Sequence, residues 1–407
     1  MILRAKFVLP MVQPPIEDGA VVVEGDTVLA VGPVKDIQTG YGGEARDLGE
    51  VVLLPGLINA HCHLDYTDMV HEVEWRGSFI EWILQLVALK QLRSDKQYLA
   101  AIQSGMTQLL KSGTTSVVNI ECFPPLIDQL PPAQLRIWWC MELIDFNRPD
   151  PAKDIAQQAL EVIAARQNIL GGFGLAPHAP YTASADLYRL AGQHTRARNI
   201  LLTTHLAESE QEDDMFRHGT GPMYDYFLRA GRDMSDCKRV GPVQLLSELA
   251  VLAPNCLAAH ANYLMPLDVT LLKQSGTHVV HCPRSHRFFN RPTPLLSVFW
   301  QNDINVCLGT DSLVSNDTLD MFAEMQTLTR EFPRIPAEKV LSMATVCGAK
   351  ALNLSDKLGK IAAGAWADLI AVPFDGARVD PYEAVVYAKN PVCFSMIGGK
   401  VVHDAEA

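Results

Sequence analysis

Two histidines separated by one residue follow the apolar run of residues 51–58. They are His61 and His63, in the stretch NAHCHLDYT. Successive residues of a strand point to opposite faces, so both imidazoles are expected on one face and Cys62 on the other. Such a pair indicates a metal site, and a hydrogen-bonded pair of core histidines is the alternative explanation.

Polar residues at the ends of later apolar segments strengthen the metal interpretation. His205 lies in the segment 199–208, and Asp311 lies in the segment 304–312. Three histidines and one carboxylate suit zinc, or iron(II) in a reduced cell. With room for a water molecule the site is catalytic, because the metal lowers the pKa of that water and supplies hydroxide near neutral pH.

Two further residues have the chemistry of proton-transfer groups. Glu208 follows His205 by three residues in HLAE, and His260 lies in AAHAN. A carboxylate and an imidazole beside a metal suit general acid–base catalysis. The alternatives are a helix first-turn carboxylate for Glu208 and a hydrogen-bonded core histidine for His260.

The elements that position these residues repeat along the chain. Eight short segments are rich in apolar and β-branched residues: 51–61, 113–121, 135–145, 171–180, 199–208, 255–264, 277–285 and 304–312. Near-continuous apolar runs are typical of buried parallel strands. Segments with helical spacing, such as 79–92, 98–111 and 185–198, lie between them. The pattern predicts a (β/α)8 TIM barrel in the α/β class, whose active site lies at the carboxyl ends of the strands.

The two ends of the chain have a different pattern. Residues 1–50 include AVVVEGDTVLAVG, and residues 359–404 include further short strands with glycine turns. Neither end is long enough to form its own core. We therefore expect residues 1–54 and 359–407 to form one small β-sandwich domain, and residues 55–358 to form the barrel.

Composition narrows the class of protein. The 407 residues are 48% hydrophobic and 20% charged, as in soluble globular proteins. The net charge of −12 argues against a nucleic-acid partner. No signal peptide and no membrane-spanning run is expected. The nine cysteines include no CxxC pair, which favours reduced thiols and a cytoplasmic location.

Five motifs together resemble those of the metal-dependent amidohydrolase superfamily. They are PGLINAHCHLD, HLAES, HAN, HCPRS and GTDS, in this order. The similarity is to the cytosine deaminase, S-adenosylhomocysteine deaminase and triazine hydrolase branch, and it covers nearly the whole chain. The resemblance implies that His61, His63, His205 and Asp311 bind the metal. It also implies that Glu208 and His260 shuttle protons and that Asp311 accepts a proton from the water.

The resemblance also bears on the number of metals. Relatives with two metals use a lysine at the end of strand four, whereas residues 171–180 contain no lysine and no acidic residue. We therefore predict one divalent ion, zinc first and iron(II) as the alternative. His178 occupies this region, and a histidine there contacts the substrate in the similar nucleoside deaminases; simple loop packing is the alternative. His286 stands where the family often has asparagine, which leaves the substrate contacts there open.

A Glu/His pair beside one metal fits hydrolytic deamination of an aminopurine or aminopyrimidine. The stretch RGSFIEWI, residues 76–83, is similar to a loop of aminodeoxyfutalosine deaminases of the alternative menaquinone pathway. Their substrate is an adenine nucleoside extended by a benzoate, and this is our first hypothesis. The second keeps the chemistry with S-adenosylhomocysteine, methylthioadenosine, adenosine or a chlorotriazine as substrate. A non-catalytic scaffold is the remote third.

A benzoate requires a cationic partner, and arginine binds carboxylates bidentately. The candidate substrate-binding residues are Arg148, Arg284, Arg287, Phe79, Trp82, His178, Ser315 and Asn316. Phe288 and Phe289 are further candidate aromatic walls. Ordinary surface charges or core aromatics are the alternative in each case. The expected partner is a small-molecule nucleoside, and a homodimer is suggested only by analogy with relatives.

Overall fold

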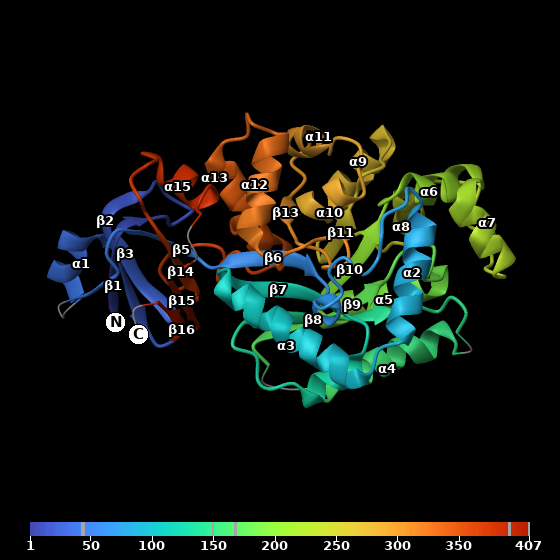
Figure 1. The fold of residues 1–407 in the computed structure, drawn as a ribbon, viewed down its shortest axis with the longest axis horizontal. Helices are drawn as coiled ribbons and strands as arrows, with labels where there is room; N and C mark the ends of the chain where they lie inside the picture. Colours follow the sequence, from blue (N-terminus) through green and yellow to red (C-terminus); the bar gives the residue numbers. More distant parts are fainter. Residues whose placement is uncertain (42–44, 149, 167–168, 390–391, 406–407) are drawn as a thin grey trace.

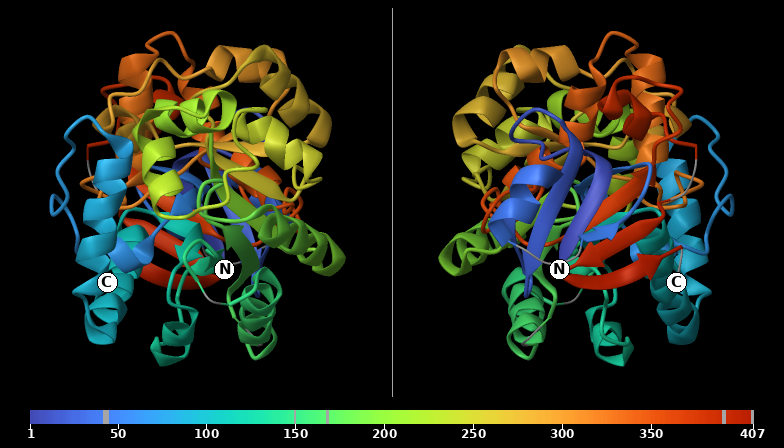
Figure 2. Two further views of the ribbon diagram at one scale, coloured as in Figure 1. Left: turned by 90° about the vertical axis from the view of Figure 1, so that its right-hand side faces the viewer. Right: turned by 90° about the vertical axis from the view of Figure 1, so that its left-hand side faces the viewer.

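The computed structural model describes residues 1–41, 45–148, 150–166, 169–389 and 392–405, which form two packed bodies (Figure 1). The larger body is a barrel of parallel strands surrounded by helices. The smaller body is a sheet that contains strands from both ends of the chain, and the two termini lie on it at separate places (Figure 2).

Eight strands form the barrel in the order of the sequence, and every pairing between neighbours is parallel. They are β6 (Leu57–Cys62), β7 (Thr114–Glu121), β8 (Arg136–Leu143), β9 (Gly171–Pro177), β10 (Leu201–Leu206), β11 (Cys256–His260), β12 (His278–His281) and β13 (Val306–Leu308). A parallel bridge between Cys62 and Asp311 brings β13 back to β6 and nearly closes the ring. The predicted barrel is confirmed.

The strands are apolar on both faces because each face packs against a different layer. Ile58, Val118, Cys140 and Val280 belong to a cluster that fills the barrel interior and includes residues of α14 (Val346–Ala351). Their neighbours along the strands, such as Val117 and Met141, belong to the cluster beneath the outer helices. Since side chains alternate between faces, the interior face continues at the carboxyl ends through residues such as Glu142, His178 and His205.

The outer helices follow the strands and bury one apolar stripe each. The principal ones are α2 (Phe79–Gln91), α3 (Asp95–Lys111), α4 (Ala152–Ala164), α5 (Ala185–Arg198), α8 (Pro242–Glu248), α9 (Pro266–Ser275), α11 (Leu296–Gln301) and α12 (Met321–Glu331). In α3 the stripe is Tyr98, Ile102, Met106 and Leu109, at the spacing of one helix face. Among the described helices, none combines the length and apolarity needed to cross a membrane.

The terminal sheet has the order β16-β15-β14-β5-β1-β2-β3, with β4 paired to β1. Its strands are β1 (Ile2–Val8), β2 (Ile16–Glu24), β3 (Thr27–Pro33), β4 (Ala45–Asp47), β5 (Val51–Pro55), β14 (Leu369–Pro373), β15 (Phe394–Ile397) and β16 (Lys400–Asp404). Leu3, Val21, Leu53, Leu369 and Phe394 share its core, so both ends of the chain build one unit. We propose the domain boundaries 1–54 with 359–407, and 55–358; residues 42–44, 390–391 and 406–407 lie outside the described residues.

A buried ion pair anchors the barrel to this sheet. Arg136, the first residue of β8, donates from Nε and Nη2 to the Asp368 carboxylate at 2.7 and 3.1 Å. The backbone N–H of Gly398 donates to the same carboxylate at 2.8 Å, and the guanidinium stacks 3.9 Å from the centre of the Trp366 ring. Both charged side chains are under 10% exposed, so neither has water as a substitute partner.

Asp368→Ala is expected to lower the free energy of unfolding by about 3–5 kcal/mol, because the Arg136 guanidinium stays buried without its counterion. Denaturant unfolding monitored by circular dichroism measures this loss. Asp186→Ala is the matched control, since Asp186 forms an exposed pair with Arg189 and such pairs contribute less than about 1 kcal/mol. If Asp368→Ala lowers the free energy of unfolding no more than the control does, the Arg136–Asp368 pair does not anchor the barrel to the sheet.

Candidate active site

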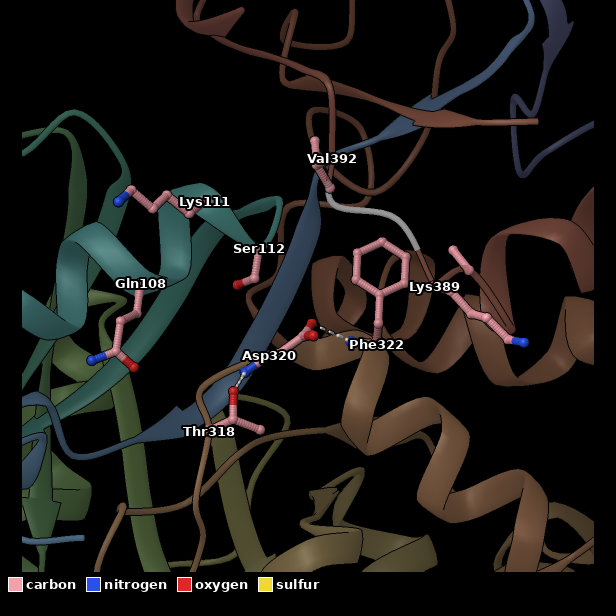
Figure 3. A pocket seen from close by; sticks show the side chains of 9 residues that line it. Gln108, Lys111, Ser112, Thr318, Asp320, Phe322, Lys389 and Val392 are labelled. Carbon is pink, nitrogen blue, oxygen red and sulfur yellow. Dashed lines mark hydrogen bonds between the residues drawn. The ribbon is translucent and has the colours of Figure 1, made fainter. Parts of the chain in front are cut away.

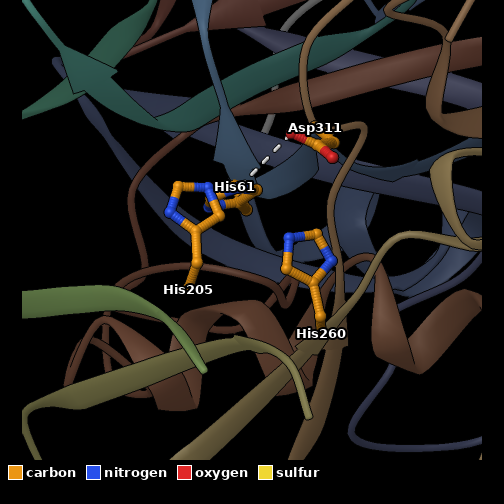
Figure 4. Close-up of side chains that lie close together, drawn as sticks. All are labelled: His61, His205, His260 and Asp311. Carbon is orange, nitrogen blue, oxygen red and sulfur yellow. Dashed lines mark ion pairs between the residues drawn. The ribbon is translucent and has the colours of Figure 1, made fainter. Parts of the chain in front are cut away.

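Four buried side chains converge at the carboxyl ends of the barrel strands. His61, His205, His260 and Asp311 each offer one ligand atom, and these atoms lie within 4.8 Å of one another. Figure 4 shows the three imidazoles and the carboxylate around one point inside the barrel. They come from the ends of β6, β10 and β11 and from the turn after β13, which are distant in sequence.

The backbone at the closing seam brings His61 and Asp311 together. The N–H groups of Thr310 and Asp311 both donate to the His61 carbonyl, at 3.1 and 3.0 Å. A Cβ atom at Gly309 would lie 2.9 Å from the His61 backbone, so only glycine permits this approach. Asp311 and His260 have positive φ angles of 59° and 75°. Such strained conformations cluster at functional sites.

His63 lies at the edge of the same cluster. Its Nε2 is 3.3 Å from His205 Nε2 and 3.7 Å from Asp311 Oδ1. The set predicted from the sequence, with His63, and the set of Figure 4, with His260, therefore share His61, His205 and Asp311. Either set provides the three histidines and one carboxylate that suit zinc or iron(II).

The protonation states of these groups match those of metal ligands. Burial, with the neighbouring imidazoles His178 and His61, lowers the pKa of His205 to about 3. Burial likewise holds the pKa values of His63 and His260 well below the usual range. Burial alone would raise the pKa of Asp311, but its interactions with His61 and His260 outweigh burial and lower that pKa well below normal. Neutral imidazoles and an ionised carboxylate are the metal-binding forms.

Hydrogen bonds orient these side chains and leave some of their nitrogen and oxygen atoms available to coordinate an ion. His205 Nδ1 donates to the His178 carbonyl at 2.9 Å, which directs Nε2 into the cluster. Asp311 Oδ2 accepts hydrogen bonds from Ser285 and Ser315 at 2.7 and 3.1 Å. Neither ring nitrogen of buried His61 has a hydrogen-bond partner among the described residues. An imidazole without a hydrogen bond, 3.6 Å from the Asp311 carboxylate, fits a cation bound between the two.

Glu208 lies between His260 and a buried arginine. Its Oε2 is 3.8 Å from His260 Nε2, and its Oε1 is 3.7 Å from an Nη of Arg291. Burial raises the pKa of Glu208 well above its ordinary value, although Arg291 works in the opposite direction. Burial therefore favours the protonated form of this carboxyl group over its charged form. The carboxyl group is suited to donate a proton to a bound molecule.

Glu212 holds the loop that carries Glu208, and our sequence analysis missed it. Its carboxylate accepts the N–H groups of Ala207 and Glu208 at 3.1 and 2.7 Å. Its own N–H donates to Ser209 Oγ at 3.1 Å, which caps α6 (Glu210–Asp213). The Ser-x-x-Glu spacing of residues 209–212 is the capping-box pattern, a signal visible in the sequence.

A pocket opens onto the cluster, and its wall opposite the strands is α2. The lining includes His63, His205, Glu208, His260 and Asp311, together with Tyr66, Phe79, Trp82, Ile83, Leu86, Val87, Lys90, Glu142, Ile144, His178, Tyr181, Thr182, Phe289 and Ser312. Of the sequence-predicted substrate residues, the structure places Phe79, Trp82 and His178 here. Phe289 joins Phe79 and Trp82 in an aromatic group with ring centres 4.9–5.4 Å from its own.

The other predicted substrate residues are not among those lining this pocket. Arg148 is exposed in the loop after β8. Arg284 pairs with Asp317 and donates to Asn316 Oδ1, and Arg284 and Arg287 line a separate hollow together with Ser315, Asn316 and Phe288. Ser315 acts behind the site, through its bond to Asp311. Position just beyond a strand does not fix side-chain direction, so these residues face elsewhere than this pocket in the structure.

Lys90 and Glu142 line the pocket and were not predicted as substrate residues. Lys90 follows Trp82 and Leu86 at intervals of four residues, so the helical period puts all three on one face of α2.

A further hollow lies near the terminal sheet, lined by Gln108, Lys111, Ser112, Thr318, Asp320, Phe322, Ala388, Lys389 and Val392 (Figure 3). It contains none of the clustered histidines.

Comparisons with known proteins agree with this geometry. A model of the amidohydrolase family matches residues 52–402. The chain is 30% identical over 406 residues to a 5-methylthioadenosine/S-adenosylhomocysteine deaminase of Syntrophobacter fumaroxidans, covering 95% of this chain and 88% of the relative. It is 31% identical over 349 residues to an aminodeoxyfutalosine deaminase of Deinococcus radiodurans, covering 81% and 80%.

Among solved structures, an adenosine deaminase from Xanthomonas campestris with bound zinc matches with a TM-score of 0.84 and 23% identity, covering 99% of this chain and 92% of that one. At this identity the match speaks for the fold. The family model spans the whole barrel and part of the terminal sheet, including the convergent histidines and Asp311. The chain belongs to the amidohydrolase family.

Proposed function

We propose that this protein is a hydrolytic deaminase of adenine nucleosides of the S-adenosylhomocysteine and methylthioadenosine type. The observation that carries the proposal is Glu208, buried and 3.8 Å from His260, at the edge of a histidine–aspartate cluster. The Syntrophobacter relative is named as such a deaminase. The alignment with it covers 95% of this chain and 88% of the relative. The comparisons thus favour the second of the sequence-based hypotheses over the first.

We assign the metal to His61, His63, His205 and Asp311, and leave His260 to the substrate. His63 and His205 direct their Nε2 atoms to within 3.3 Å of each other, whereas His260 faces Glu208. A bound divalent ion supplies hydroxide from water near neutral pH. Zinc is the first choice because a zinc-bound relative shares the fold, and iron(II) is the alternative.

The side chains then divide the proton transfers. Ionised Asp311 takes a proton from the attacking water. Glu208, held protonated, donates to the purine ring nitrogen as the adjacent amino-bearing carbon is attacked. His260 stabilises the tetrahedral centre as charge develops there. The proton taken up by Asp311 then passes to the amino group, the C–N bond breaks and ammonia leaves, while the new hydroxyl group returns a proton to Glu208.

Aminodeoxyfutalosine is the second candidate substrate. Two observations favour it: the Deinococcus relative is 31% identical, and residues 76–83 resemble the corresponding loop of such enzymes. Against it, Arg148, Arg284 and Arg287, which we had assigned to the benzoate, do not line the pocket. A place in the menaquinone pathway depends on this second candidate.

Zinc-loaded protein is expected to release ammonia from at least one adenine nucleoside in a panel. The panel contains S-adenosylhomocysteine, methylthioadenosine, adenosine, aminodeoxyfutalosine, cytosine and a chlorotriazine. Each reaction is followed by the change in ultraviolet absorbance. Inactivity toward every nucleoside with metal bound would overturn the proposal. Activity only on aminodeoxyfutalosine would move the assignment to the second candidate.

His63→Ala is expected to lose bound metal, whereas His260→Ala should keep one ion per chain and lose turnover. Metal content by mass spectrometry and the melting temperature with and without added zinc measure this. Ligand at about 100 times its Kd stabilises by about 2.7 kcal/mol, so a lost site shows as a lost shift. His218→Ala removes an exposed histidine and is the control. Metal loss in His260→Ala alone would reverse our ligand assignment, and metal-free wild-type protein would revive the scaffold hypothesis.

Glu208→Gln is expected to retain the metal and to lower kcat by about 10²–10⁴-fold, because the amide cannot supply the proton. Steady-state rates and metal content are measured on the same preparation. Glu210→Gln is the matched control, since Glu210 is exposed two residues further on. Unchanged turnover in Glu208→Gln would remove this residue from the mechanism.

A further inference from the structure

Two opposite charges line the pocket away from the metal ligands. Lys90, in the last turn of α2, is the one lysine or arginine among the described lining residues. Glu142, near the end of β8, lines the same pocket. Both residues are intermediate in exposure, and both line the pocket.

The two charges do not form a direct ion pair, because the Cys122 thiol lies between them. The Lys90 ammonium is 3.5 Å from Cys122 Sγ, and Sγ donates to Glu142 Oε2 at 3.0 Å. The Tyr66 hydroxyl contacts the same sulfur at 2.8 Å. An ammonium has three donors and a thiol is a weak acceptor, so Lys90 keeps donors for a ligand. Glu142 likewise keeps Oε1 as an acceptor.

Both groups are charged near neutral pH. Burial disfavours the Lys90 ammonium, but attraction to Cys122, Glu142 and Asp65 outweighs it and raises the pKa. Burial also opposes ionisation of Glu142, while Lys90 and His178 lower the pKa of its carboxyl group. This part of the pocket therefore presents the Lys90 cation and the Glu142 anion, with the Cys122 thiol between them.

The Tyr66 ring lies between Lys90 and His63, one of the proposed metal ligands. The Tyr66 ring stacks on His63, with centres 5.5 Å apart, and its other neighbour is Lys90 Nζ, 4.9 Å from the ring centre. A substrate group that reaches Lys90 is therefore not the ring that reacts at Glu208. It belongs to the substituent of the nucleoside.

We propose that Lys90 and Glu142 form a subsite for an α-amino-acid zwitterion, with the substrate carboxylate on Lys90 and its ammonium on Glu142. This rests on the proposed function and narrows the substrate class to adenine nucleosides with an amino-acid tail, as in S-adenosylhomocysteine. A methylthio group provides no charge for either residue. A benzoate satisfies Lys90 but faces the Glu142 carboxylate without a compensating cation.

The subsite predicts substrate-dependent losses in two separate variants. Lys90→Met and Glu142→Gln are each expected to lower kcat/KM for S-adenosylhomocysteine by about 10- to 100-fold, the usual effect of losing a hydrogen bond to a charged group. The loss should appear in KM, and kcat/KM for methylthioadenosine should change less than about threefold. Lys96→Met, which removes an exposed lysine at the start of α3, is the control.

Folding is checked by melting temperature, and the two variants are independent, so one misfolded variant leaves the other decisive. Equal losses for both substrates, or no loss for S-adenosylhomocysteine, would overturn the subsite. A wild-type enzyme that prefers methylthioadenosine over S-adenosylhomocysteine would also overturn it and leave the proposed function intact. Inactivity of wild-type protein on all nucleosides is instead the failure of the proposed function.

Discussion

The closure of the barrel between β6 and β13 is the constraint on which the rest of the site depends. Two backbone N–H groups of the turn after β13 donate to the His61 carbonyl, and the Asn59 side chain bonds Thr310 at 2.8 Å. These bonds fix Asp311 against His61 before any ligand is considered. The remaining ligands come from strands whose positions follow from the parallel registers of the barrel.

Burial turns this geometry into a chemical site. Burial lowers the pKa values of His63, His205 and His260, and interactions with His61 and His260 lower the pKa of Asp311. The same burial acts in the opposite direction on Glu208, which has one cation, Arg291, at 3.7 Å. Two carboxyl groups in one pocket thus have opposite protonation preferences, which is the arrangement that acid–base catalysis requires.

The wall of the pocket opposite the strands is formed largely by α2. Phe79 and Trp82 on α2 belong to an aromatic group with Phe289, and Lys90 lies on the same side of the helix two turns later. The ends of the barrel strands supply the clustered histidines and Asp311, whereas α2 and the end of β8 supply other parts of the pocket wall. Substrate choice within the family can therefore change without disturbing the metal ligands.

The sequence by itself determined the barrel, the union of the two ends of the chain and the identity of the polar residues at the strand ends. Periodicity and the alternation of side chains are local properties, so they are readable from the printed chain. The fold then brought together His61, His63, His205, Glu208, His260 and Asp311, as their positions at strand ends suggested.

Only the tertiary structure decided which cations face the pocket. Arg148, Arg284 and Arg287 follow strands, but a loop side chain takes its direction from local partners, and Arg284 turns to Asp317 and Asn316. Lys90 lies on a helix whose orientation over the barrel is set by packing against distant segments, such as α7 (Gly221–Arg229). Such orientation depends on long-range contacts, and these are absent from any local pattern of residues.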